Sequence, residues 1–189
     1  MRLDVWHYMR RLARGCTTES HPLYGTFITR LSACIFEWDL EDYHLLVEAK
    51  CHELVSAGIL DPSEAAAKSG ITKNELSKHC RRRTRGEEKT TQLIEELLLS
   101  LSSATDTLGV PLLKDEMSEI WSEEKKHVKC LQDPPDVQLY TIIRHVEKGG
   151  VRLPVFHCAR GSTSLESFHL HLARFIPGTA ANAAISRLT

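Results

Sequence analysis

Apolar residues recur every three or four positions along most of the chain, which is the spacing of one face of an α-helix. This pattern predicts helices over residues 3–15, 23–38, 39–57, 87–104, 114–130, 136–148 and 165–175. Residues 151–158 alternate apolar with other side chains after a Gly149–Gly150 turn, so they are the best strand candidate. The predicted fold class is mainly α: a helical bundle with at most one or two short strands.

Residues 61–80 have the pattern of two short helices joined by a glycine. Asp61 is predicted to cap the first helix, with Pro62 at its first position. Thr72, followed three residues later by Glu75, fits a capping box at the start of the second helix. The pair is typical of a helix-turn-helix motif, and its second helix is predicted to continue into the arginines of residues 81–85.

Composition places the chain among ordinary globular domains: 189 residues, 42% hydrophobic and 26% charged. No apolar run approaches the roughly 18 residues of a membrane span, so no membrane partner is expected. No secretory signal pattern opens the chain, and its six cysteines are scattered without a CxxC pair. These features predict reduced thiols and a nuclear or cytoplasmic protein that is not secreted.

The net charge is only −1, but it is unevenly distributed, with −7 over residues 37–64 and +5 over residues 71–86. Basic and amide side chains of the second segment are candidates for contacts to DNA, because they can neutralise phosphates or reach into a groove. The candidate DNA-binding residues are Lys73, Asn74, Lys78, Arg81, Arg82, Arg83 and Arg85. The alternative is an ordinary packing corner followed by a solvated arginine face or a localisation signal.

Two short motifs near the ends of the chain carry candidate chemistry. Asp4 and His7 are three residues apart at the start of a predicted helix, so their side chains share a face. Near the other end, Glu166 lies in the first turn of a predicted helix, with His169 one turn later. Taken singly, Asp4 is explained as a helix cap and Glu166 as a carboxylate favoured by the helix dipole.

Together the two motifs resemble the later part of RNase H-like (DDE/D-type) DNA transposases. The resemblance rests on Asp4-x-x-His7 followed by Met-Arg-Arg-Leu, and on the segment Gly-Ser-Thr-Ser-Leu-Glu166-Ser-Phe-His169. It implies that Asp4 and Glu166 are the second and third catalytic acids and metal ligands, with His7 and His169 as neighbours. The two acids are 162 positions apart, and the chain between them would then hold a helical insertion.

The resemblance also implies a chemistry and its limits. Carboxylates of this family clamp two Mg²⁺ or Mn²⁺ ions for metal-dependent DNA cleavage and strand transfer. Because Asp4 follows Met1 so closely, the first acid and its strand are absent from this chain. The expected product is a transposon-derived fragment, truncated at its N-terminus and inactive alone.

Three segments follow from this interpretation: 1–38 after the second acid, 39–148 as the helical insertion, and 149–189 with a strand and the glutamate helix. DNA is the expected partner, and the oligomeric state is left open. The alternative function is a non-catalytic DNA- or protein-binding helical module. The histidines and cysteines near the C-terminus lack the paired spacings of a zinc site, and no P-loop, GxGxxG or nucleophile elbow occurs.

Overall fold

The computed structural model describes residues 3–160, so the predicted helix over 165–175 lies outside the described range. The chain divides into two units, Met1–His157 and Cys158–Thr189, and almost all described residues belong to the first. The described part is mainly helical, which confirms the predicted fold class, and it adds two small antiparallel sheets of two strands each.

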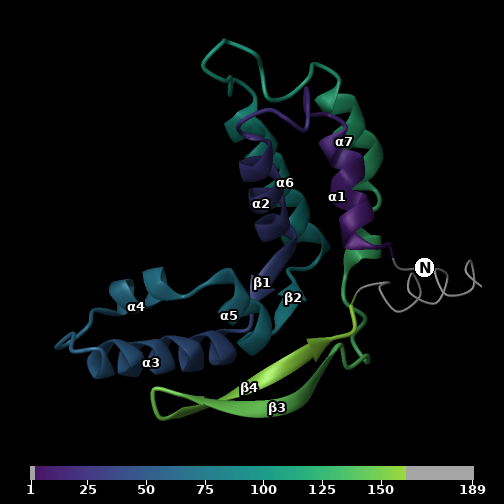
Figure 1. The fold of residues 1–189 in the computed structure, drawn as a ribbon. Coiled ribbons are helices and arrows are strands. Elements are labelled where there is room, and N and C mark those ends of the chain that lie inside the picture. The colour runs from purple at the N-terminus through teal and green to yellow at the C-terminus, as the bar shows by residue number, and fades with distance from the viewer. Residues whose placement is uncertain (1–2, 161–189) are drawn as a thin grey trace, which may run out of the picture. The chain divides into compact units, whose positions relative to one another are not determined.

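Figure 1 shows the elements in chain order. Their bounds are α1 Val5–Ala13, α2 Tyr24–Ile35, β1 Phe36–Trp38, α3 Leu40–Ser56, α4 Glu64–Gly70, α5 Lys73–His79, β2 Arg82–Thr84, α6 Glu87–Leu101, α7 Met117–Lys125, the 3₁₀ helix η1 Val128–Leu131, β3 Tyr140–Lys148 and β4 Val151–Cys158.

Aspartates fix the starts of α1 and α3. Asp4 Oδ1 accepts a hydrogen bond from the backbone N–H of His7, and Asp39 Oδ1 accepts one from the N–H of Asp42, both at 3.2 Å. Each such cap satisfies a backbone donor that the first helical turn leaves unpaired, and stabilises the helix by about 1 kcal/mol.

The two short helices over residues 61–80 form as predicted, but the first begins later. Thr72 and Glu75 make the predicted capping box of α5. Ser63, not Asp61, caps α4, because its hydroxyl accepts a hydrogen bond from the first turn at 3.2 Å. Asp61 has φ 52° and belongs to the preceding turn, so Pro62 lies before the cap and not at the first helical position.

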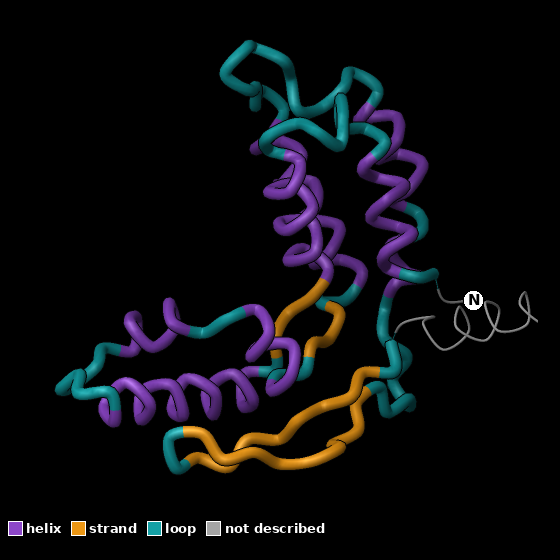
Figure 2. Tube along the Cα trace, in the orientation of Figure 1, coloured by secondary structure: helices purple, strands orange, loops and turns teal. Residues whose placement is uncertain are grey.

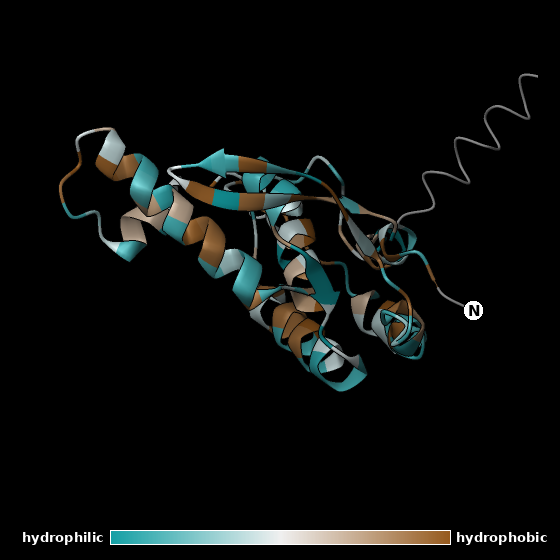
Figure 3. Cartoon of the chain, turned by 90° about the horizontal axis from the view of Figure 1, so that it is seen from below, coloured by the Kyte–Doolittle hydropathy of each residue, from teal (hydrophilic) through white to brown (hydrophobic). Residues whose placement is uncertain are grey.

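The larger apolar core lies among α1, α2, α6, α7 and η1. Figure 3 shows hydrophobic and hydrophilic residues alternating around the helices, as expected for elements with one buried face. The fully buried side chains of this core include Tyr8, Leu12, Phe27, Leu31, Ile94 and Leu112. Full burial of one such apolar side chain contributes about 1.5–3 kcal/mol.

A second, smaller core packs α3 and the end of α5 against β4. It consists of Leu46 and Ala49 from α3, Cys80 directly after α5, and Leu153 from β4. The ring nitrogen Nδ1 of His79 lies 2.8 Å from the carbonyl oxygen of Pro154, so a polar contact joins the same elements.

A short ribbon of β1 and β2 joins the parts of the chain that carry the two cores. Figure 2 shows this ribbon between α2 and α6 on one side and α3 and α5 on the other. Its antiparallel register places Glu37 opposite Arg83 and Trp38 opposite Arg82. Because β1 follows α2 and β2 precedes α6, residues 39–81 leave and rejoin the first group of helices at adjacent positions.

The predicted helix over 136–148 is wrong, because these residues form β3 and the loop before it. Residues 141–143 are Thr-Ile-Ile, and such β-branched side chains favour a strand. The predicted strand over 151–158 is confirmed as β4, and it pairs with β3 across the predicted Gly149–Gly150 turn.

Two other predicted helices are too long. The helix over 23–38 ends at Ile35, and α5 ends at His79 instead of continuing through the arginines. The residues beyond each end pair with one another as β1 and β2, so the described part has four strands and not the predicted one or two. The predicted helices over 87–104 and 114–130 form in shorter versions, as α6 and as α7 with η1.

Candidate functional site

Asp4 lies at the N-cap of α1, where one of its carboxylate oxygens is committed to the backbone N–H of His7. The side chain of His7 is exposed. The helix-cap explanation of this pair is therefore confirmed. The second motif, with Glu166 and His169, lies outside the described residues.

The two ends of the helical body, which consists of residues 3–130, lie next to each other. Leu3 N donates a hydrogen bond to Cys130 O at 2.9 Å, so the residue before Asp4 is bonded to the end of η1. The next residues of the chain continue along the ribbon. Asp133 Oδ2 accepts a hydrogen bond from Thr84 N at 3.0 Å, and Thr84 Oγ1 accepts one from Asp133 N at 2.8 Å. The body therefore starts and ends at neighbouring positions.

Arg81 is the most deeply engaged of the candidate DNA-binding residues. Asp42, which is 7% exposed, accepts from Arg81 N at 2.9 Å, from Nε at 2.7 Å and from a terminal nitrogen at 3.1 Å. The guanidinium also lies over the ring of Phe156, 5.3 Å from its centroid. Hydrogen bonds from Arg81 to Asp42 raise the pKa of the guanidinium further, so Arg81 serves as a charged structural link.

The other three arginines also contact the β1–β2 ribbon. Arg83 Nε and Arg85 donate to the two carboxylate oxygens of Glu37, at 2.7 and 3.0 Å. Arg82 lies over the rings of Phe36 and Trp38, 4.8 and 5.3 Å from their centroids. In this conformation the arginine run stabilises the ribbon, with its charges largely matched inside the chain.

The arginines have three acidic partners that the sequence did not predict: Glu37, Asp42 and Asp39, whose Oδ1 accepts from a terminal nitrogen of Arg81 at 3.4 Å. The signal was the opposite charge of the two segments, −7 over residues 37–64 and +5 over residues 71–86. Two segments of opposite charge in one chain can pair with each other, and this pairing within the chain should be considered before pairing with DNA.

The remaining candidate residues lie on the surface of α5. Lys73, Asn74 and Lys78 are all exposed, as is Ser77 between them. Neither Lys73 nor Lys78 makes an ion pair among the described residues. This exposed face is the part of the helix-turn-helix-like segment that is available to a polyanion.

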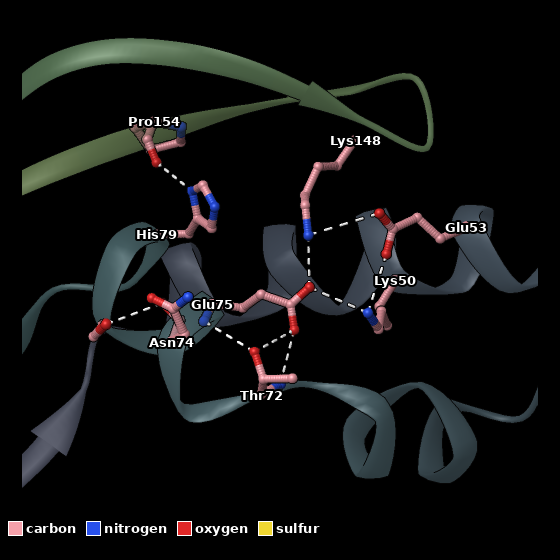
Figure 4. A network of polar contacts seen from close by, with 9 residues as sticks. Lys50, Glu53, Thr72, Asn74, Glu75, His79, Lys148 and Pro154 are labelled. Carbon is pink, nitrogen blue, oxygen red and sulfur yellow. Dashed lines mark hydrogen bonds and ion pairs between the residues drawn. The ribbon is translucent and has the colours of Figure 1, made fainter.

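A polar network that the sequence did not predict joins α3, α5 and β3 (Figure 4). Glu75 Oε1 accepts from Lys50 at 3.1 Å and from Lys148 at 2.6 Å, and both lysines also pair with Glu53. Burial opposes the ionised form of Glu75, but the hydrogen bonds from Lys148 and Thr72 outweigh it and hold its pKa far below the ordinary value.

The described residues contain no group of three or more His, Cys, Asp or Glu side chains arranged to hold a metal ion. All six cysteines lie within residues 3–160, and all are free in the structure. None of the helices in this range combines the length and apolar character that a membrane crossing requires.

Comparison of the chain with protein-family models, with curated proteins and with solved structures found no match. Arguments about function therefore depend on the residues themselves.

Proposed function

We propose that the chain is a transposon-derived portion of an RNase H-like transposase, consisting of the helical insertion and the segments that flank it, without catalytic activity of its own. Asp4 and Glu166 are the acids inherited from the parent enzyme. Metal-dependent DNA cleavage and strand transfer is the ancestral activity.

The observation that carries the proposal is the hydrogen bond between Leu3 N and Cys130 O. Domains tolerate insertion into another fold when their two ends lie close together, because the host fold is then interrupted at a single place. The helical body between residues 3 and 130 meets this requirement; it contains the segment before the predicted insertion of residues 39–148 as well as most of that insertion.

The described residues do not by themselves form the metal site of such an enzyme. Asp4 is the only one of the two acids in the described range, and its Oδ1 is used as a helix cap. A two-ion site needs several carboxylates to share the charge of the cations. No catalytic step is therefore assigned to the described residues.

Mn²⁺ provides the test, because this paramagnetic ion broadens the amide resonances of residues close to it. The wild-type chain should show broadening around both Asp4 and Glu166, and Asp4→Asn or Glu166→Gln should abolish it at both places. Asn caps a helix as well as Asp does, so Asp4→Asn keeps α1 intact. Asp106→Asn is the matched control, since Asp106 likewise accepts backbone N–H bonds through Oδ1.

Broadening that persists in Glu166→Gln, or that is absent around Asp4, would contradict a metal site shared by the two acids. A plasmid-nicking assay with Mn²⁺ addresses the inactivity: wild type and Glu166→Gln should give the same background. Nicking by wild type alone would instead show a working catalytic site.

The exposed face of α5 favours a second candidate function, a DNA-binding module that acts without catalysis. Duplex DNA should then bind with an affinity that falls steeply with salt. The double variant Lys73→Gln/Lys78→Gln should weaken that binding, and Lys89→Gln/Lys126→Gln, which removes two exposed lysines outside α5, is the control of equal charge. Equal affinities for the two variants would remove α5 from consideration.

A further inference from the structure

A cavity of about 300 Å³ opens where the C-terminal end of α1 meets the turn over residues 16–19 and the chain near Lys114. Its polar lining includes Arg10, Arg14, Thr17, Thr18, Glu19 and Lys114. Three of the charged groups are cations and one is an anion. The volume lies at the lower end of the roughly 300–1,000 Å³ that small-molecule sites occupy.

Lys114 supplies the unneutralised charge of this cavity. Its ammonium group donates to the carbonyl oxygen of Arg14 at 3.1 Å, and no described carboxylate lies within ion-pairing distance of it. Arg10 and Glu19 form an ion pair at 3.2 Å, with both side chains at least half exposed, so they largely cancel one another. The carbonyl oxygen accepts a hydrogen bond from Lys114 but carries no formal charge, so the charge of the ammonium group is not neutralised and the cavity stays positive.

The guanidinium of Arg14 is the second cation of the cavity, and two contacts fix its position. Its Nε donates to Arg11 O at 3.1 Å, and a terminal nitrogen lies 3.5 Å from Glu124 Oε1. Glu124 is nearly buried, with 6% of its side chain exposed, so its ion pair with Arg14 holds one end of the exposed guanidinium against the protein. The helix C-terminus would ordinarily repel an anion, but Arg14 and Lys114 cover the carbonyls of the last turn.

The neutral groups of the cavity add a donor and no negative charge. Thr18 Oγ1 accepts a hydrogen bond from Ser20 N at 3.2 Å, which leaves its own O–H to donate. Burial raises the pKa of the Cys16 thiol to about 11, although Lys114 partly opposes the shift. The thiol is therefore neutral at physiological pH.

We propose that this cavity binds a phosphate group, with Lys114 and Arg14 facing its oxyanions and the Thr18 hydroxyl donating a further hydrogen bond. The site goes beyond the proposed function, because it needs neither Asp4 nor Glu166. Two sources carry this chemistry: the backbone of DNA, and a free phosphate or phosphate-bearing small molecule.

The first experiment titrates pyrophosphate into the full-length chain at constant ionic strength and follows its amide resonances. Shifts should concentrate at residues 14–19 and at Lys114. Lys114→Gln should weaken binding about tenfold, the effect of one charge-assisted hydrogen bond, and Lys114→Arg should retain it. The control is Lys68→Gln on α4, which removes an exposed lysine that pairs with Glu64 at 2.6 Å.

Thr18→Val is the second test variant, because it leaves the charge unchanged and removes an exposed hydroxyl, together with the hydrogen bond that this hydroxyl accepts from Ser20 N. It should weaken pyrophosphate binding about three- to fivefold, the effect of a single neutral hydrogen bond. Shifts spread over all surface cations would overturn the proposal. So would a Lys114→Gln variant that binds as tightly as Lys68→Gln.

A labelled DNA duplex then distinguishes the two sources by fluorescence anisotropy. Loss of DNA binding in Lys114→Gln, with competition by pyrophosphate, supports the DNA backbone as the ligand. Pyrophosphate binding that depends on Lys114, combined with DNA binding that does not, supports a small phosphate ligand. Comparison with Lys73→Gln/Lys78→Gln separates this cavity from the α5 face.

Discussion

Replacing Arg81 by Gln is expected to destabilise the fold, because Arg81 neutralises a buried carboxylate. The substitution removes the two side-chain hydrogen bonds to Asp42, at 2.7 and 3.1 Å, and leaves only the backbone N–H at 2.9 Å. It also removes the guanidinium from the ring of Phe156.

The magnitude follows from the burial of the two partners. Breaking a fully buried ion pair costs about 3–5 kcal/mol, because one charge is left uncompensated. Asp42 is 8% exposed at its side chain but Arg81 is 41% exposed, so water can enter the vacated space and reduce the cost. The expected loss in the free energy of unfolding is about 2–3 kcal/mol, including about 0.5–1 kcal/mol for the contact with Phe156.

Urea unfolding of wild type, Arg81→Gln and Arg83→Gln measures this loss. Arg83 is the matched control because its side chain is 66% exposed and it bonds only to Glu37 on the neighbouring strand. Its substitution should cost less than about 1 kcal/mol. The reasoning is refuted if the two variants lose equal stability, or if Arg81→Gln unfolds within about 0.5 kcal/mol of wild type.

Three further predictions concern the second core and the thiols. Since the pKa of Glu75 is lowered in the fold, its stabilisation is complete above the unfolded pKa of about 4.3 and is lost as pH falls through and below it. The stability difference between wild type and Glu75→Gln in urea should therefore shrink from pH 7 to 3, and a constant difference would contradict this. Gly149→Ala should lower Tm more than Gly150→Ala: both have positive φ, but only at Gly149 would the new Cβ meet backbone, at 2.6 Å from Ala49 O; equal shifts would argue against it. A thiol reagent should modify the exposed Cys158 quickly in the native protein, and Cys80, whose pKa burial raises to about 12, only on unfolding; equal rates would mean that the second core opens readily.

The features that the sequence predicted correctly depend on neighbouring residues. Asp39 begins α3 and Thr72 begins α5 because a cap needs only a side-chain oxygen and a backbone N–H three residues later. The turn at Gly149–Gly150 is equally local, since both residues adopt a positive φ that glycine reaches without strain. Asp61 was chosen wrongly over Ser63 because both residue types cap helices, and only the path of the chain decides between them.

The features that were missed depend on residues far apart in the sequence. Phe36 and Thr84 are paired in the ribbon although 47 intervening residues separate them, so nothing near either residue marks a strand. The stacking of Arg82 on Trp38 and the salt bridges of Glu37 stabilise that pairing only after the fold of residues 39–81 has brought β2 next to β1. Hydrophobic spacing alone therefore extended both flanking helices through the strands.

Contacts within the chain also decide which cations can bind a polyanion. A phosphate contact to Arg81 would first require its release from Asp42, at a cost of about 2–3 kcal/mol that is similar to the gain from one charge-assisted hydrogen bond. The net gain is then close to zero. Lys73, Lys78 and Lys114 are exposed and have no ion pair among the described residues, so each would keep nearly the whole of that gain. A charge substitution at Lys114 should therefore change phosphate binding and substitutions at Lys73 and Lys78 should change DNA binding, whereas substitutions in the arginine run should mainly change stability.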